Sequence, residues 1–97
     1  MGKEIIWTPK AEESFKKVLN YLKTNWTEKE VLFFIEKTNT IVSYISNDPK
    51  IFRKSTKMGF HEALITKHNL LIYKIKFKTI YLIAFWDTRQ NPKRKLK

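Results

Sequence analysis

Apolar residues recur with a helical period through most of the first half of the chain. After Thr8-Pro9 they fall on one helix face, at Ala11, Phe15, Val18, Leu19 and Leu22. Thr is a good N-cap and Pro is tolerated at the first helical position, so the helix is expected to begin there. A second helix begins at Thr27-Glu28-Lys29-Glu30, which fits a capping box, and ends at Asn47-Asp48-Pro49. Because the two segments are closely joined, the sequence predicts an antiparallel helical hairpin.

A short apolar run, Ile5-Ile6-Trp7, predicts a strand before the helices. After the helices the apolar period shortens to about two, which is typical of strands. Four further strands are expected over residues 51–55, 60–66, 71–77 and 80–86, with Lys78-Thr79 as the last turn. Residues 80–86 are apolar on both faces, so this strand is expected to be central and the most buried.

These elements follow the order β-α-α-β-β-β-β within a single domain, residues 1–97, of the α+β class. Hairpin-length connections make the last strands antiparallel. We expect the helical hairpin to pack on one face of a mainly antiparallel sheet, leaving the opposite face and the rim to Lys and Arg. Residues from about 88 to 97 form a basic tail that we expect to be flexible.

Composition excludes several classes of site. The chain has no cysteine, so it can hold neither a disulfide nor a Cys-based zinc site, and it has no thiol nucleophile. No metal or other cofactor is expected. No apolar run reaches the ~18 residues of a membrane span, and the start lacks the apolar stretch of a signal peptide. We therefore expect a cytoplasmic protein that does not contact membranes.

Charge is distributed very unevenly along the chain. The formal net charge is +11 over 97 residues. Residues 1–49 carry seven Lys and seven acidic residues, whereas residues 50–97 carry thirteen Lys or Arg and only two acids, Glu62 and Asp87. The whole excess of positive charge therefore belongs to the second half, which indicates a polyanionic partner: nucleic acid, an anionic membrane or an acidic protein.

Four short motifs, in this order, resemble the RelE/ParE superfamily of toxins from type II toxin–antitoxin systems. The first is Trp7-Thr8-Pro9-Lys10-Ala11 after an apolar strand, and the second is Ile45 to Asp48-Pro49 at the end of the second helix. The third is Leu71-Ile72-Tyr73-Lys74-Ile75, and the fourth is the segment from Phe85 to Pro92, which contains Arg89. The resemblance covers nearly the whole chain and implies the same fold.

The resemblance also implies a bacterial toxin that arrests growth and is neutralised by a cognate antitoxin with an acidic segment. RelE-like members enter the ribosome and cleave mRNA, whereas ParE-like members inhibit DNA gyrase and are not known as nucleases. Fold alone does not separate these mechanisms, so the site must.

A ribonuclease site of this kind would be incomplete. RNA cleavage through the 2′-OH needs a base, cations for the phosphate and an acid for the leaving oxygen. When the chain is aligned with RelE-like ribonucleases on Tyr73, their phosphate-binding Arg falls at Leu70. Those enzymes also use a Tyr late in the chain, but here no Tyr follows Tyr81. Arg89 matches the Arg that those enzymes carry after the last strand.

Several residues nevertheless remain candidates for a site. His61 and His68 have the only side chains whose unperturbed pKa lies near neutrality, so with Arg89 they are the catalytic candidates. A histidine at a strand edge or in a turn can equally be structural. The candidates for binding nucleic acid or another target are the basic residues Arg53, Lys54, Lys74, Lys76, Arg89, Lys93, Arg94 and Lys95. Trp86 near Arg89 could either close the core or stack on a base.

These observations leave three hypotheses for the function. The charge excess slightly favours a RelE-like, ribosome-dependent mRNA interferase, an endoribonuclease that works from a basic sheet surface. The missing Arg and Tyr favour a ParE-like gyrase inhibitor without catalytic activity. A catalytically degenerate family member that acts only as a binding module is the third hypothesis.

Overall fold

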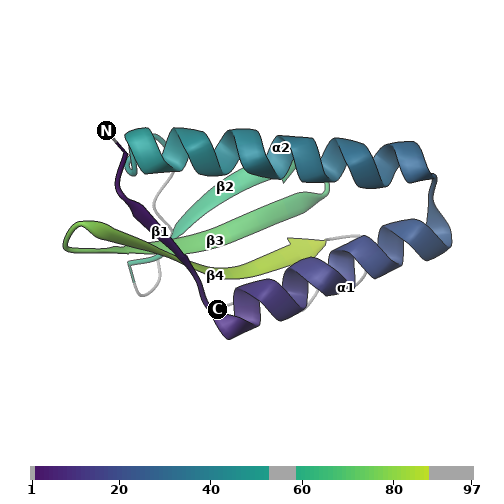
Figure 1. Ribbon diagram of the computed structural model, residues 1–97, viewed down its shortest axis with the longest axis horizontal. Helices are drawn as coiled ribbons and strands as arrows, with labels where there is room; N and C mark the ends of the chain where they lie inside the picture. The colour runs from purple at the N-terminus through teal and green to yellow at the C-terminus, as the bar shows by residue number, and fades with distance from the viewer. Residues whose placement is uncertain (1, 53–58, 88–97) are drawn as a thin grey trace.

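The computed structural model describes residues 2–52 and 59–87, which form one sheet covered on one face by two helices (Figure 1). The elements in chain order are β1 (Glu4–Trp7), α1 (Pro9–Asn25), α2 (Glu28–Asn47), β2 (His61–Thr66), β3 (Asn69–Lys76) and β4 (Thr79–Asp87). This is the α+β arrangement that the sequence predicts.

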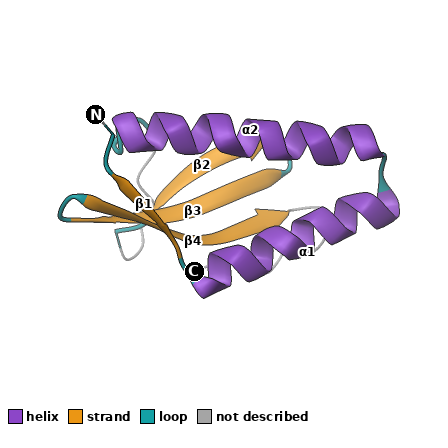
Figure 2. Cartoon of the chain, viewed as in Figure 1, coloured by secondary structure: helices purple, strands orange, loops and turns teal. Residues whose placement is uncertain are grey.

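The described strands form one sheet in the order β1-β4-β3-β2 (Figure 2). β1 runs parallel to β4, and the two hairpins β2–β3 and β3–β4 are antiparallel. The prediction of a central, largely buried last strand is confirmed, since β4 lies between β1 and β3.

Two predictions about the strands are wrong. Ile51 and Phe52 of the strand expected at 51–55 lie in a bend, and Ile51 N donates to Asp48 O at 3.0 Å in a turn that follows α2. Residues 53–55 lie outside the described part of the chain. The other error concerns Phe77, which was expected to end a strand. β3 ends at Lys76, and the turn is Phe77-Lys78 rather than Lys78-Thr79.

The predicted N-caps are confirmed by hydrogen bonds. Thr8 Oγ1 accepts from Ala11 N at 3.1 Å, and Thr27 Oγ1 accepts from Glu30 N at 3.3 Å. Thr8 Oγ1 also donates to Leu82 O at 2.7 Å, beside a bulge that leaves Ile83 of β4 without a partner on β3. The first turn of α1 is thereby fixed to the central strand, which sets the direction of the helix across the sheet.

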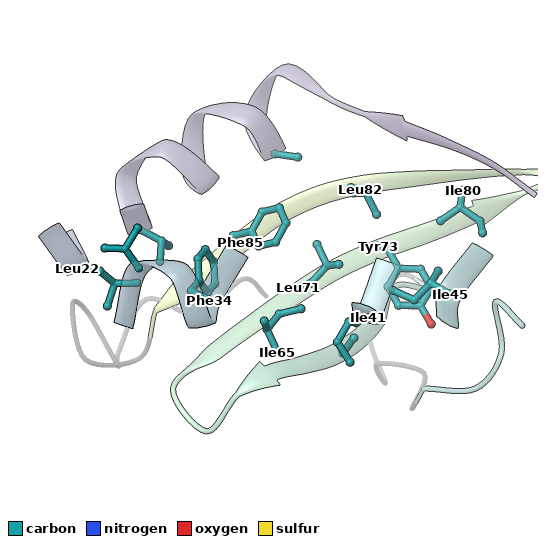
Figure 3. Close-up of a cluster of buried hydrophobic side chains, with 14 residues drawn as sticks. Leu22, Phe34, Ile41, Ile45, Ile65, Leu71, Tyr73, Ile80, Leu82 and Phe85 are labelled. Atoms are coloured by element: carbon teal, nitrogen blue, oxygen red, sulfur yellow. The ribbon is translucent and has the colours of Figure 1, made fainter. Parts of the chain in front are cut away.

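The helices close the core over one face of the sheet. α1 packs on β4 and α2 on β2, and the two helices converge at the turn that joins them (Figure 1). Phe34 and Leu22 from the helices meet Phe85, Leu71 and Ile65 from the sheet (Figure 3). Burying a side chain of this size contributes roughly 1.5–3 kcal/mol to stability, so these contacts hold the two layers together.

The opposite face of the sheet, here called the outer face, carries a different set of side chains. Strand alternation places Leu64, Leu70, Ile72, Lys74 and Trp86 there. Ile72 is buried, yet it is not part of the core cluster beneath the helices. The outer face is therefore partly apolar, although the sequence was expected to leave it to Lys and Arg.

No helix in residues 2–52 or 59–87 is long and apolar enough to cross a membrane.

Candidate target-binding surface

His61, the first catalytic candidate, lies in the core. It begins β2 on the helix-covered face, and only 8% of the residue is exposed. Its ring stacks on Tyr73 with the centroids 5.1 Å apart and an interplanar angle of 19°. Its Nδ1 lies 3.3 Å from Phe52 O, a contact in which the Nδ1–H tautomer donates. These contacts give His61 a packing role at the end of the core.

Tyr73, like His61, is held in place by a contact with a backbone carbonyl. Its hydroxyl donates to Pro49 O at 2.8 Å, and the side chain is fully buried. Burial disfavours the phenolate and raises the pKa of Tyr73 from 10.0 to about 12. A hydroxyl that is both buried and this weakly acidic is poorly suited to proton transfer at neutral pH.

His68 lies at the opposite end of β2, in the turn to β3, so the structure does not bring the two histidines together. Together with Lys67, it lines a hollow of about 480 Å³ between this turn and the helical hairpin. Trp26 and Phe33, both roughly half exposed, supply the apolar wall of the hollow, and Glu30 lies beside them.

A buried polar network supports that turn from below. His68 N donates to Thr66 Oγ1 at 3.3 Å, and Thr66 Oγ1 donates to Asn69 Oδ1 at 2.5 Å. Asn69 Nδ2 in turn donates to Asp87 Oδ2 at 3.1 Å. Asn69 is thereby one of the partners of the buried Asp87 carboxylate.

Of the residues predicted to bind the target, only Lys74 and Lys76 lie in the part of the chain that the structure describes. Lys74 and Lys76 are exposed on β3, and Lys74 Nζ lies 5.7 Å from the centroid of the Phe60 ring. His61 pairs with Tyr73, next to Lys74 in the chain, but the histidine lies on the helix-covered face and the lysine on the outer face. The other candidates, Arg53, Lys54, Arg89, Lys93, Arg94 and Lys95, lie outside the described residues.

Across the outer face, Leu64, Leu70 and Trp86 form one row over three adjacent strands. Leu64 pairs with Leu70, and Leu70 pairs with Trp86. Leu64 is 55% exposed, and the buried Nε1 of Trp86 has no hydrogen-bond partner among the described residues. We call these three residues the apolar row. Its central member, Leu70, is the residue that the resemblance to RelE-like ribonucleases matches to their phosphate-binding Arg.

The apolar row is not visible in the sequence because it depends on strand register. Leu64 and Leu70 belong to different predicted strands, and only the pairing shows that they face the same way. No cluster of three or more His, Asp or Glu side chains within residues 2–52 and 59–87 could hold a metal ion.

Comparison with known proteins gives a consistent result. The model of the family "ParE toxin of type II toxin-antitoxin system, parDE" matches residues 5–92. Among curated proteins, none has a sequence that matches this chain.

Solved structures share the fold at low sequence identity. The chromosomal ParDE toxin–antitoxin system from P. aeruginosa matches with a TM-score of 0.75 and 14% identity, over 88% of this chain and 95% of that one. The E. coli toxin RelE in its free state matches at 0.65 and 12%, over 95% and 90%. The YoeB dimer from Staphylococcus aureus matches at 0.62 and 19%, over 89% and 97%.

At such identities the structural likeness establishes the RelE/ParE-like fold alone, while the family match over most of the sequence narrows the assignment within it: the chain belongs to the family of ParE toxins of type II toxin–antitoxin systems.

Proposed function

We propose that this toxin stops growth by binding DNA gyrase, as a ParE-like inhibitor without catalytic activity. The charge excess by itself slightly favours a RelE-like mRNA interferase. The observation that carries the proposal is the apolar row of Leu64, Leu70 and Trp86 on the outer face, in which Leu70 stands where RelE-like ribonucleases are expected to carry a phosphate-binding Arg. The family match supports the same choice.

The positions of the titratable groups also favour binding over cleavage. RNA cleavage requires a base and an acid within hydrogen-bond reach of one phosphodiester. His61 is buried beneath the helices, and the pKa of Tyr73 is raised to about 12. His68 lies at the far end of β2, so these three groups do not converge on one substrate.

The outer face carries the apolar row and, further along β3, Lys74 and Lys76, a combination suited to a protein target. Leu64 presents an exposed aliphatic surface, and desolvating such a surface is the main source of affinity in protein interfaces. Lys74 and Lys76, on the same face, would add charge complementarity to an acidic target and speed association.

The proposal includes a cognate antitoxin. Solved structures with this fold include the toxin–antitoxin complexes YoeB–YefM from Staphylococcus aureus and DinJ–YafQ from E. coli. We infer that an acidic segment of the antitoxin complements the basic half of this toxin. Induced expression should therefore arrest growth, and co-expression of the neighbouring small gene should relieve the arrest.

Two assays with one toxin preparation test the mechanism. We expect gyrase supercoiling to stop while a cell-free translation reaction proceeds at its full rate. Arrest of translation with cleaved mRNA and unaffected supercoiling would instead establish the interferase hypothesis and refute the gyrase proposal. A His61→Gln variant separates the two mechanisms further, because it should remain toxic if His61 only packs against Tyr73.

A matched pair of variants tests the apolar row. Leu64→Asp places a charge in the row, whereas Leu32→Asp places the same charge on α2 at nearly equal exposure, 56% against 55%. We expect Leu64→Asp to weaken gyrase inhibition at least tenfold and Leu32→Asp to leave it within twofold. Equal inhibition by the two variants would show that the row does not contact the target.

A further inference from the structure

The hairpin of β3 and β4 extends beyond the helical layer and ends in a two-residue turn, Phe77-Lys78 (Figure 1). Lys76 and Thr79 form the last pair of the ladder, so the turn is supported by paired strands up to its base. Phe77 is 90% exposed, more than any other large hydrophobic residue in the described part of the chain.

The backbone at Phe77 is as unusual as its exposure. Its φ is 57°, and it is the one non-glycine residue with positive φ among residues 2–52 and 59–87. A two-residue hairpin turn with positive φ at its first position favours glycine, because a Cβ atom there meets the backbone. An aromatic residue is therefore unfavourable here both in conformation and in exposure, and its ring contributes little to the core.

Strained residues that the fold does not require are found mainly at functional sites. The composition around Phe77 indicates what the ring could contact. Lys74, Lys76 and Lys78 alternate with apolar residues along the tip, and Lys76 and Lys78 flank Phe77 directly. The nearest acidic residue in the sheet register is Glu4, which pairs with Thr79 at the start of β1.

We propose that this tip binds single-stranded nucleic acid, with the Phe77 ring stacked on an unpaired base and Lys76 and Lys78 on the neighbouring phosphates. Aromatic rings on a basic surface bind single strands in this way, because every base has a stacking face and every linkage carries a charge. The inference concerns a different surface from the apolar row and does not depend on whether the target is gyrase or the ribosome.

Two other ligand classes fit the tip less well. An apolar pocket on a protein would accept the ring but gives no reason for a lysine on each side of it. A membrane surface would attract the lysines, but one aromatic ring buries too little area to anchor the chain. Cation, ring and cation on consecutive residues match a polymer that alternates phosphates with bases.

The test is fluorescence anisotropy of the full chain with three labelled oligonucleotides of one sequence: single-stranded DNA, single-stranded RNA and duplex DNA. We expect both single strands to bind more tightly than the duplex. Phe77→Gly should weaken single-strand binding about tenfold or more while keeping the salt dependence. Lys78→Gln should lower the slope of log affinity against log salt by about 0.7.

Leu32→Ala is the control, because it removes an exposed apolar side chain from α2 without touching the tip. It should bind the oligonucleotides as the wild type does. Circular dichroism and thermal unfolding of Phe77→Gly should show an intact fold, since glycine is favoured at this backbone conformation. Wild-type affinity in Phe77→Gly, or a wild-type chain that prefers the duplex, would overturn the proposal.

Discussion

The two hairpin turns of the sheet meet the same geometric requirement in different ways. Both connect antiparallel strands through two residues, and both must fit the right-handed twist of the strands. The β2–β3 turn, Lys67-His68, has a register shift between Leu64 and Thr66 and no residue with positive φ. The β3–β4 turn, Phe77-Lys78, follows a ladder that is regular from the Tyr73–Leu82 pair to the turn, and it places Phe77 at φ 57°.

The side chains reinforce this difference. The first turn rests on buried hydrogen bonds that join Thr66, Asn69 and Asp87. Phe77 has no polar side-chain atom that could offset its backbone strain, and its ring points away from the core at 90% exposure. One turn is therefore built for stability and the other carries an unfavourable residue, which is the pattern expected when stability and function occupy separate regions.

Removing Asn69 should break the stable turn and have the largest effect. Asn69→Ala deletes a side chain that is 1% exposed and takes a hydrogen-bond donor from Asp87, which is 2% exposed. Removing a hydrogen-bond donor from a buried carboxylate costs roughly 2 kcal/mol, so we expect the free energy of unfolding in urea to fall by about that amount. Lys67→Ala, in the same turn but exposed, should change it by less than about 0.5 kcal/mol. Equal losses from both variants would contradict the role of the network.

Removing the Tyr73 hydroxyl should have an intermediate effect on stability, because this hydroxyl bonds β3 to the segment after α2. Tyr73→Phe removes the hydrogen bond to Pro49 O while keeping the ring stacked on His61. We expect a loss of about 1 kcal/mol in the free energy of unfolding at neutral pH. A variant as stable as the wild type would mean that packing alone holds the hairpin.

The difference in stability between the wild type and Tyr73→Phe should also depend on pH in the alkaline range. Because the pKa of Tyr73 is raised from 10.0 to about 12, the folded chain holds the phenolic proton more tightly than the unfolded chain does. The resulting stability is complete below pH 10 and is lost as pH rises through 12. The difference in unfolding free energy between wild type and Tyr73→Phe should therefore shift against the wild type between pH 10 and pH 12. A difference that does not change over this range would refute the buried phenol as its source.

Local signals in the sequence are sufficient for part of this structure. The caps at Thr8 and Thr27 depend on residues three positions away, so a short window predicts them. The central position of β4 follows from residues 80–86, which are apolar on both faces of the strand. The strand prediction at Ile51 fails because it followed the apolar residues there and took the turn signal Asp48-Pro49 to end before Ile51. The hydrogen bond from Ile51 N to Asp48 O shows that the turn extends to Ile51.

The site is harder to predict because it depends on which way each strand faces. His61 alternates with Ala63 and Ile65, two buried residues, so the period of two already places it on the core side. That alternation by itself argues against a catalytic role for His61. Phe77 continues the pattern of Leu71, Tyr73 and Ile75, and nothing in that alternation indicates that the strand ends one residue earlier.

The smallest expected effect has the opposite sign and separates strain from the ring. Phe77→Gly should raise the free energy of unfolding by about 0.5–1 kcal/mol, because relief of a positive-φ side chain outweighs the extra flexibility of glycine in the unfolded chain. Phe77→Ala loses the same ring but keeps a Cβ atom at φ 57°, so it should remain as stable as the wild type. Urea unfolding of the pair measures the difference directly. If glycine proves no more stable than alanine, the turn carries no strain, and the exposure of Phe77 must be explained by its ring alone.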